Sequence, residues 1–204
     1  MNAIATLLDG MDRGRPLLPQ MEAVLRDDID WRAAVEEHMA ALGIGDLVRL
    51  ARHDSETPDV DPRVLTVAER DGVGLVRINL FSRERFARLW RGGTLSPHYH
   101  RRSFATRIIK GAYHHLRFDN AGSQDTPQLT CTSREVLRTD SGYGIEWQEY
   151  HFVMFPADAT VTINVHLPPA VPAKVTGPPA SADTLARLRG DILTALAAES
   201  ASTA

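Results

Sequence analysis

Residues 92–111 read GGTLSPHYHRRSFATRIIKG, and this stretch decides the fold that the sequence predicts. Its two histidines, His98 and His100, are two residues apart. Because successive side chains of a strand point to opposite faces, this spacing places both imidazoles on one face. If that face is the inside of a barrel, both rings point at one interior spot, as two ligands of one metal ion must. A pair of structural histidines is the alternative interpretation; the position after Gly92-Gly93 and a proline favours the metal.

Short strands are expected around this stretch, from about residue 63 to residue 167. Asp71-Gly72 has the composition of a hairpin turn, and Gly and Pro recur at the spacing of a sandwich or barrel. The expected strands cover residues 64–69, 73–80, 85–90, 103–110, 112–118, 128–138, 143–155 and 160–167.

The two ends of the chain have a helical pattern instead. Residues 2–52 repeat apolar side chains at helical spacing, and Asp30 is placed to cap one of these helices. Residues 53–62 are expected to be a connector, and residues 168–180 a Pro-rich strap. Ser181 is expected to cap a last amphipathic helix. We therefore expect a single globular domain made of a helical extension (1–62), a β-barrel with its strap (63–180) and a C-terminal helix (181–204).

Composition narrows the classes of function. The 204-residue chain is 43% hydrophobic and 24% charged, as in ordinary globular proteins. Its formal net charge of −3 gives no electrostatic support for nucleic-acid binding. Cys131 is the only cysteine, so an intramolecular disulfide is impossible and a cytoplasmic location is expected. Residues 1–16 lack the pattern of a signal peptide, and no apolar run is long enough to predict a membrane span.

The central stretch resembles the first motif of the cupin family. That motif is a glycine, five residues, HxH, three or four residues, a glutamate, six residues and a glycine. Gly92, His98, His100 and Gly111 fit this frame, but Phe104 occupies the glutamate position. The resemblance implies a mainly β fold, the cupin double-stranded β-helix or jelly-roll barrel, here with N-terminal helices and a C-terminal helix. The phenylalanine at the glutamate position favours a three-histidine site over a site with a carboxylate.

Two later histidines extend the resemblance to the thiol dioxygenases, the cupin branch that contains cysteine dioxygenase. His151 and His166 are fifteen residues apart, and His166 precedes Pro168-Pro169. The segment from Arg77 to Gly93 also looks like the region before that family's first motif. This resemblance, over about residues 73–169, implies that His98, His100 and His151 hold iron and that His166 acts beside it as a catalytic residue. Pro168 stands where cysteine dioxygenase has a tyrosine, and no cysteine lies near Phe104, so that enzyme's thioether crosslink is not expected.

Two arginines and an adjacent pair of histidines are further candidates for the site. Arg77 lies mid-strand, where it is either solvated or turned inward; the resemblance implies that it binds a substrate carboxylate, and a guanidinium suits that geometry. Arg107 has a weaker claim because its parity is opposite to that of the HxH pair. His114 and His115 are adjacent, so at most one faces inward, and surface or core-edge roles are expected for both.

These expectations combine into one predicted function. Three neutral imidazoles leave a divalent metal with its full positive charge and with open positions, which attracts an anionic ligand and leaves room for O2. The resemblance implies Fe(II), although zinc and other divalent metals also bind three histidines. The expected partners are a small anionic substrate, with thiols among the candidates, and O2. The alternatives are a metal-dependent cupin enzyme with other oxidative chemistry, as in specialised metabolism, and a non-catalytic ligand-binding cupin. The sequence does not fix the oligomeric state.

Overall fold

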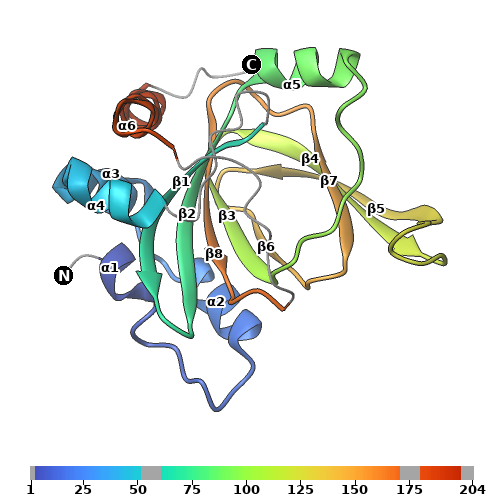
Figure 1. Cartoon of the computed structure of the whole chain (residues 1–204), viewed down its shortest axis with the longest axis horizontal. Helices are drawn as coiled ribbons and strands as arrows, with labels where there is room; N and C mark the ends of the chain where they lie inside the picture. The colour runs from blue at the N-terminus through green and yellow to red at the C-terminus, as the bar shows by residue number, and fades with distance from the viewer. Residues whose placement is uncertain (1–2, 52–60, 171–179, 199–204) are drawn as a thin grey trace.

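The computed structural model describes residues 3–51, 61–170 and 180–198. These residues form two antiparallel sheets that face each other, with most of the helices grouped on one side (Figure 1). The larger sheet has the order β1-β2-β8-β3-β6, and the smaller sheet has the order β5-β4-β7. The strands are β1 (Arg63–Arg70), β2 (Gly74–Phe81), β3 (Phe104–Lys110), β4 (Ala112–Asn120), β5 (Leu129–Arg138), β6 (Gly142–Ile145), β7 (Tyr150–Met154) and β8 (Thr160–His166).

The helices begin where the sequence places their caps. The Asp30 carboxylate accepts a hydrogen bond from the Ala33 amide, and the Ser181 hydroxyl accepts one from the Thr184 amide. None of the described helices has the length and apolar character of a membrane span. The helices are α1 (Ala3–Leu7), α2 (Leu17–Arg26), α3 (Trp31–Ala41), α4 (Ile44–Leu50), α5 (Arg83–Arg91) and α6 (Ala182–Ala197).

The main hydrophobic core lies between the five-stranded sheet and the helices α1–α4 and α6, which cover its outer face (Figure 1). Strand β8, TVTINVH, is buried along its whole length. Its apolar residues Val161, Ile163 and Val165 join this core, whereas Thr162 and Asn164 line the cavity inside the barrel. The apolar side chains of this strand therefore face the helices, and its polar side chains face the barrel interior. In a sheet whose outer face is solvated, the two sides would be reversed.

The segment expected as a strand at residues 85–90 is the helix α5, so that prediction was wrong. Phe86 and Leu89 are three residues apart, the spacing of one helix face, and both are buried. The Ser82 hydroxyl caps the helix by accepting a hydrogen bond from the Arg85 amide. Gly93, at φ 68°, follows the C-cap. The helical period and the cap outweigh the β-like composition of so short a segment.

The single strand expected over residues 143–155 is two strands in different sheets. The chain leaves the five-stranded sheet after β6, turns between Glu146 and Glu149, and enters the three-stranded sheet as β7. The Glu149 amide donates to the Glu146 carbonyl, and Gln148 adopts a positive φ of 101°. Because neither glycine nor proline marks this turn, the sequence pattern carries no signal for it.

Gly111, which closes the HxH motif, is required by packing. Its φ is +92°, and a Cβ at this position would lie 2.9 Å from the Thr160 Cα atom. The glycine therefore allows the end of β3 to approach the start of β8 closely. The predicted connector at residues 53–62 and the predicted strap at residues 168–180 lie mostly outside the described residues.

Candidate metal centre

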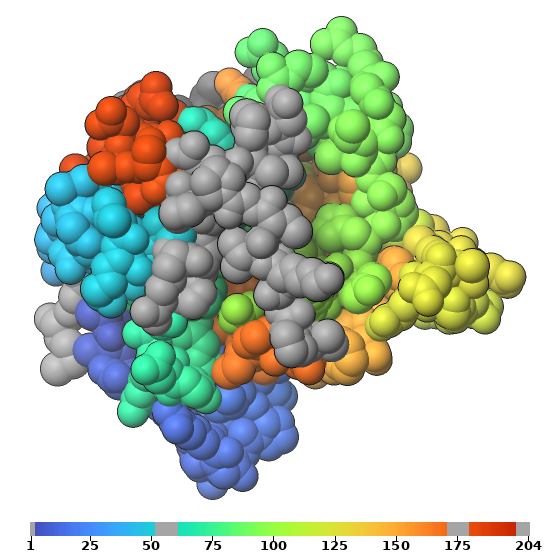
Figure 2. All heavy atoms as spheres, viewed as in Figure 1, coloured from blue at the N-terminus to red at the C-terminus, as the bar shows by residue number. Residues whose placement is uncertain are grey.

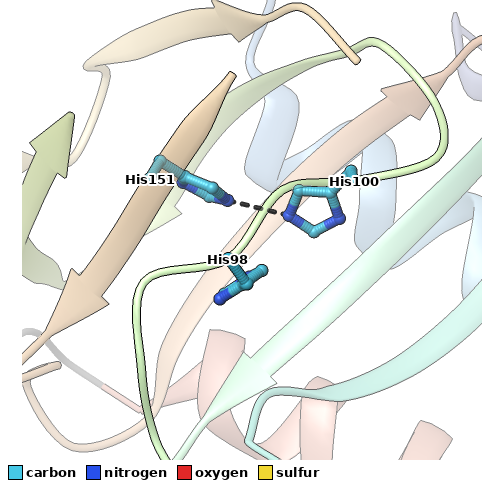
Figure 3. A group of neighbouring side chains, drawn as sticks. All are labelled: His98, His100 and His151. Carbon is cyan, nitrogen blue, oxygen red and sulfur yellow. Dashed lines mark hydrogen bonds between the residues drawn. The ribbon is translucent and has the colours of Figure 1, made fainter. Parts of the chain in front are cut away.

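Three histidines meet inside the barrel, at one end of the cavity between the sheets. His98, His100 and His151 each offer one ligating nitrogen, and these atoms lie within 4.8 Å of one another. Figure 3 shows the three rings turned toward a common space, with His151 on a strand and the other two on the segment before β3. The His100 Nε2 atom lies 2.8 Å from the His151 Nε2 atom. The three predicted metal ligands are thus brought together by the fold.

The backbone fixes this arrangement, although His98 and His100 do not lie on a regular strand as expected. The His98 amide donates to the His151 carbonyl at 3.0 Å, and the His151 amide donates to the His98 carbonyl at 2.9 Å. This reciprocal pair is an isolated antiparallel bridge. It holds the segment between α5 and β3 against β7. The period-2 spacing therefore predicted correctly that the two rings lie close together, although the segment is not the regular strand that was expected.

His100 and His151 are in the neutral form that binds metals. Burial lowers the pKa of His100 to about 3, and the electrostatic influence of the neighbouring His98 and Arg77 side chains adds to the effect. Burial also lowers the pKa of His151 well below its ordinary value. The His98 Nδ1 atom lies 3.1 Å from the Ser96 carbonyl oxygen. Since a carbonyl only accepts, Nδ1 carries the proton and Nε2 keeps its lone pair for a ligand.

His115 belongs to this centre, contrary to the expectation of a surface or core-edge role. Its ring is buried, and its Nε2 atom lies 3.0 Å from the His151 Nδ1 atom. It also stacks on the Tyr143 ring at a centroid distance of 3.9 Å. His114 lies on the opposite face of β4, where it contacts Phe155. The parity rule allowed one inward histidine, but it could not tell which of the two faced the barrel.

A cavity of about 410 Å³ adjoins the three histidines, and His166 lines it. The His166 ring stacks on Phe104 at 5.1 Å, and the Phe104 ring contacts His100 at 4.8 Å, both between centroids. Phe104, at the motif's glutamate position, therefore separates His166 from the centre as an apolar spacer. Burial, followed by the charge of Arg77, lowers the pKa of His166 well below its ordinary value and keeps the ring neutral.

Arg77 also lines the cavity, so it points into the barrel rather than into solvent. Its Nε atom donates to the Thr66 hydroxyl at 3.3 Å. Arg107 lies on the outer face of β3, where it pairs with Asp140 at 2.9 Å, and it is no candidate for the site. Arg102 donates to the Leu167 carbonyl. Of Arg77, Arg102 and Arg107, only Arg77 lines the cavity.

His98, which lines the cavity, is exposed. In Figure 2 this face of the molecule is hollowed beside α5 and the segment that follows it. The yellow atoms of the β5 region protrude on one side, away from the hollow. Cys131 lies on that strand and is exposed, so it contributes nothing to the centre.

Comparisons with known proteins give a likeness of fold at low similarity. No family model matches the sequence, and no curated protein matches it. The solved structure of KdgF from Halomonas sp. is similar at 14% identity and a TM-score of 0.38, over 57% of this chain and 89% of that one. An RmlC-like cupin from Shewanella frigidimarina is 13% identical, with a TM-score of 0.37 over 58% and 87% of the two chains. A double-stranded β-helix cupin from Methanocaldococcus jannaschii is 13% identical, with a TM-score of 0.36 over 56% and 84%.

These values carry no inference about activity. The fold rests on the chain's own two-sheet topology, in which the helices α1–α4 precede the barrel and α6 follows it. The predicted double-stranded β-helix fold of the cupins, with N-terminal helices and a C-terminal helix, is confirmed, but the described residues have mixed helix and strand content rather than the mainly β content expected.

Proposed function

We propose that this chain is a non-heme iron(II)-dependent oxygenase that inserts oxygen from O2 into a small anionic substrate, with thiols among the candidates. One observation carries the proposal: three histidine side chains converge beside a cavity with room for a small molecule. His98, His100 and His151 would hold the metal.

The donor set fits a divalent ion. Each residue offers one imidazole nitrogen. The Nδ1 atoms of His98 and His151 have hydrogen-bond partners outside the cluster, so Nε2 is the atom of each ring that would coordinate. When bound, Fe(II) held by three neutral ligands supplies a cationic centre with open positions for an anionic substrate and O2. Zinc would accept the same three ligands, so metal identity is a matter for measurement.

Arg77 and His166 complete the proposed site from the five-stranded sheet. The Arg77 guanidinium faces the cavity, where it can hold a substrate carboxylate by a charge-assisted hydrogen bond. His166, buried and neutral, also faces the cavity and can accept or return a proton at a ring nitrogen. Phe104 keeps His166 apart from the three ligands, which suits a role beside the metal rather than on it.

A second candidate is a metal-dependent enzyme with a different oxidation and a larger substrate. Pro168 and the exposed Cys131 rule out the crosslink of cysteine dioxygenase in this chain. The cavity of about 410 Å³ also lies within the range of about 300–1,000 Å³ that accommodates drug-sized ligands. Both observations favour a substrate longer than free cysteine.

Metal analysis followed by oxygen uptake tests the proposal. The purified protein is expected to hold one divalent metal per chain, measured by elemental analysis. The iron(II) form is then mixed with a panel of thiols and carboxylic acids in an oxygen electrode. Consumption of O2 with thiols supports the oxygenase, consumption only with other anions supports the second candidate, and protein that takes up no metal refutes both.

A further inference from the structure

The polar interior of the five-stranded sheet extends well beyond the metal centre. The inward-facing residues of β2 and β8 pair across the sheet in successive rows, Arg77 with Asn164 and then Asn79 with Thr162. All four line the cavity. Each row lies two residues further along the strand, about 6.6 Å at the usual rise.

The metal centre lies at one end of this series. His166 follows Asn164 of the Arg77 row by two residues along β8, and through Phe104 it adjoins His100. Asn79 is therefore about 13 Å along the sheet from the His166 row, at two residues per row. Asp61 lies further on, because its Oδ1 atom accepts a hydrogen bond from the Ser82 amide just after β2. The cavity thus has a metal end and a remote end.

The remote end presents two buried hydrogen-bond acceptors. Among the residues that the structure describes, Asn79 Oδ1 and Asp61 Oδ2 have no hydrogen-bond partner, and both residues line the cavity. By contrast, Asn164 donates from Nδ2 to the Thr162 hydroxyl at 2.8 Å. Buried acceptors are nearly always paired, so two such acceptors on one cavity wall are placed to receive hydrogen bonds from a molecule that occupies the cavity.

We propose that Asn79 and Asp61 form a distal subsite that binds hydroxyl or amine groups of an elongated substrate. This inference rests on the proposed function, in which the other end of the substrate binds at the metal. The substrate class is therefore a linear molecule with an anionic donor atom at one end, a carboxylate in reach of Arg77, and a hydroxyl or ammonium group at the far end.

The electrostatics of Asp61 are compatible with either donor. Burial raises the pKa of Asp61 to about 6, while the Ser82 amide, Arg85 and Arg63 oppose the shift. At neutral pH the carboxylate is mostly ionised and attracts an ammonium, whereas an uncharged hydroxyl needs only an acceptor. Replacing Asp61 by asparagine keeps an acceptor for the Ser82 amide and removes the charge, so it separates these two sources.

Calorimetric titration with matched thiols tests the subsite on the anaerobic iron(II) form. The probes are plain alkanethiols and the ω-hydroxy and ω-amino alkanethiols of the same chain lengths. When the alkyl chain is long enough to reach Asn79, a terminal hydroxyl or amine is expected to tighten binding about tenfold relative to the plain alkanethiol of the same length. This is the gain expected when a buried acceptor obtains its hydrogen bond. Asn79→Leu should abolish that advantage and leave plain alkanethiols unaffected; a folding defect would weaken all probes alike.

Asp61→Asn then identifies the donor. Loss of the ω-amino advantage alone shows that the Asp61 charge binds an ammonium, and retention of both advantages shows that Asn79 accepts the donor without that charge. If all thiols bind equally at every length, the distal subsite is refuted while the metal-centred function stands. If no thiol binds, the thiol form of the proposed function fails, and linear diols and diamines are titrated into the same protein. Binding that depends on Asn79 then supports the subsite on its own, and no binding refutes it.

Discussion

Replacing His115 by leucine is expected to weaken binding of a divalent metal about ten- to a hundredfold. His115 is 2% exposed, and its Nε2 atom lies 3.0 Å from the His151 Nδ1 atom. Burial, with the charge of Arg117 adding to it, lowers the pKa of His115 to about 3, so the ring is neutral. When His151 coordinates a metal through Nε2, its proton is on Nδ1, and the neutral His115 can accept a hydrogen bond from it at Nε2; this bond would hold His151 in the coordinating tautomer.

The magnitude follows from the loss of that acceptor. A buried N–H group left without a partner costs about 1–3 kcal/mol, and about 1.4 kcal/mol corresponds to tenfold in affinity. In the metal-free protein His151 can move its proton to Nε2 and donate to His100 instead, so the penalty falls mainly on the metal-bound form. The effect should therefore appear in the affinity for metal and not in the melting temperature of the metal-free protein.

The assay is a competition titration of Fe(II) or Zn(II) against a chromophoric chelator. His114→Leu is the matched control, because it removes the neighbouring histidine from the opposite face of the same strand. His115→Gln, whose amide oxygen can accept the same hydrogen bond, should recover part of the affinity. Wild-type affinity in His115→Leu, or an equal loss in His114→Leu, would refute the reasoning.

Four further outcomes are expected. The double variant His98→Ala, His100→Ala should lose most of its metal by elemental analysis; wild-type content would sink the ligand assignment. His166→Ala should keep its metal but lose about ten- to a hundredfold in activity, and a metal-bound structure with His166 on the metal would overturn this role. Arg77→Leu should weaken carboxylate-bearing ligands about ten- to a hundredfold and spare uncharged analogues; an equal change in both would make it an ordinary strand residue. Asp61→Asn should stabilise the protein above pH 6 by about 2 kcal/mol, after allowance for partial exposure. The folded pKa of Asp61, about 6, exceeds the ordinary value of 3.8, so above pH 6 the wild-type protein must keep a buried acid ionised. Chemical denaturation below pH 4, where the acid is protonated in both states, should show no such difference.

Much of the metal centre could be predicted because its geometry is encoded in short-range spacing. The HxH pair and the glycines at both ends of the motif specify which side chains converge and where the chain turns. His151 was identified by its distance from His166 through a family resemblance, since nothing local to YHFVM distinguishes a ligand from a core residue. The structure adds the reciprocal backbone bridge between His98 and His151, a contact between segments fifty residues apart that no window reveals.

The features that the sequence did not predict depend on whether a side chain faces the barrel interior, the helices or the solvent. In the α5 segment, helical spacing of Phe86 and Leu89 was present, but its brevity and its aromatic content favoured a strand. For His114 and His115 the parity was clear, yet the inward side depends on how β4 pairs with β7 across the smaller sheet. Asn79 had no sequence signal at all, because a polar residue among apolar neighbours normally indicates a solvated face. Only the helical layer over the outer face shows that the polar side is the interior.

The two sheets therefore divide the work of the proposed site. The three-stranded sheet supplies His151 and its partner His115 and, through the backbone bridge, holds the segment that carries His98 and His100. The five-stranded sheet supplies Arg77, Asn79 and His166 from strands that the helical core buries on their outer side. Because metal ligation and the remaining polar contacts come from different sheets, substitutions on β2 can change the length and charge of the substrate without disturbing the metal. The polar row on β2 is accordingly where a change of specificity should be sought, and the β4–β7 pair is where metal affinity is set.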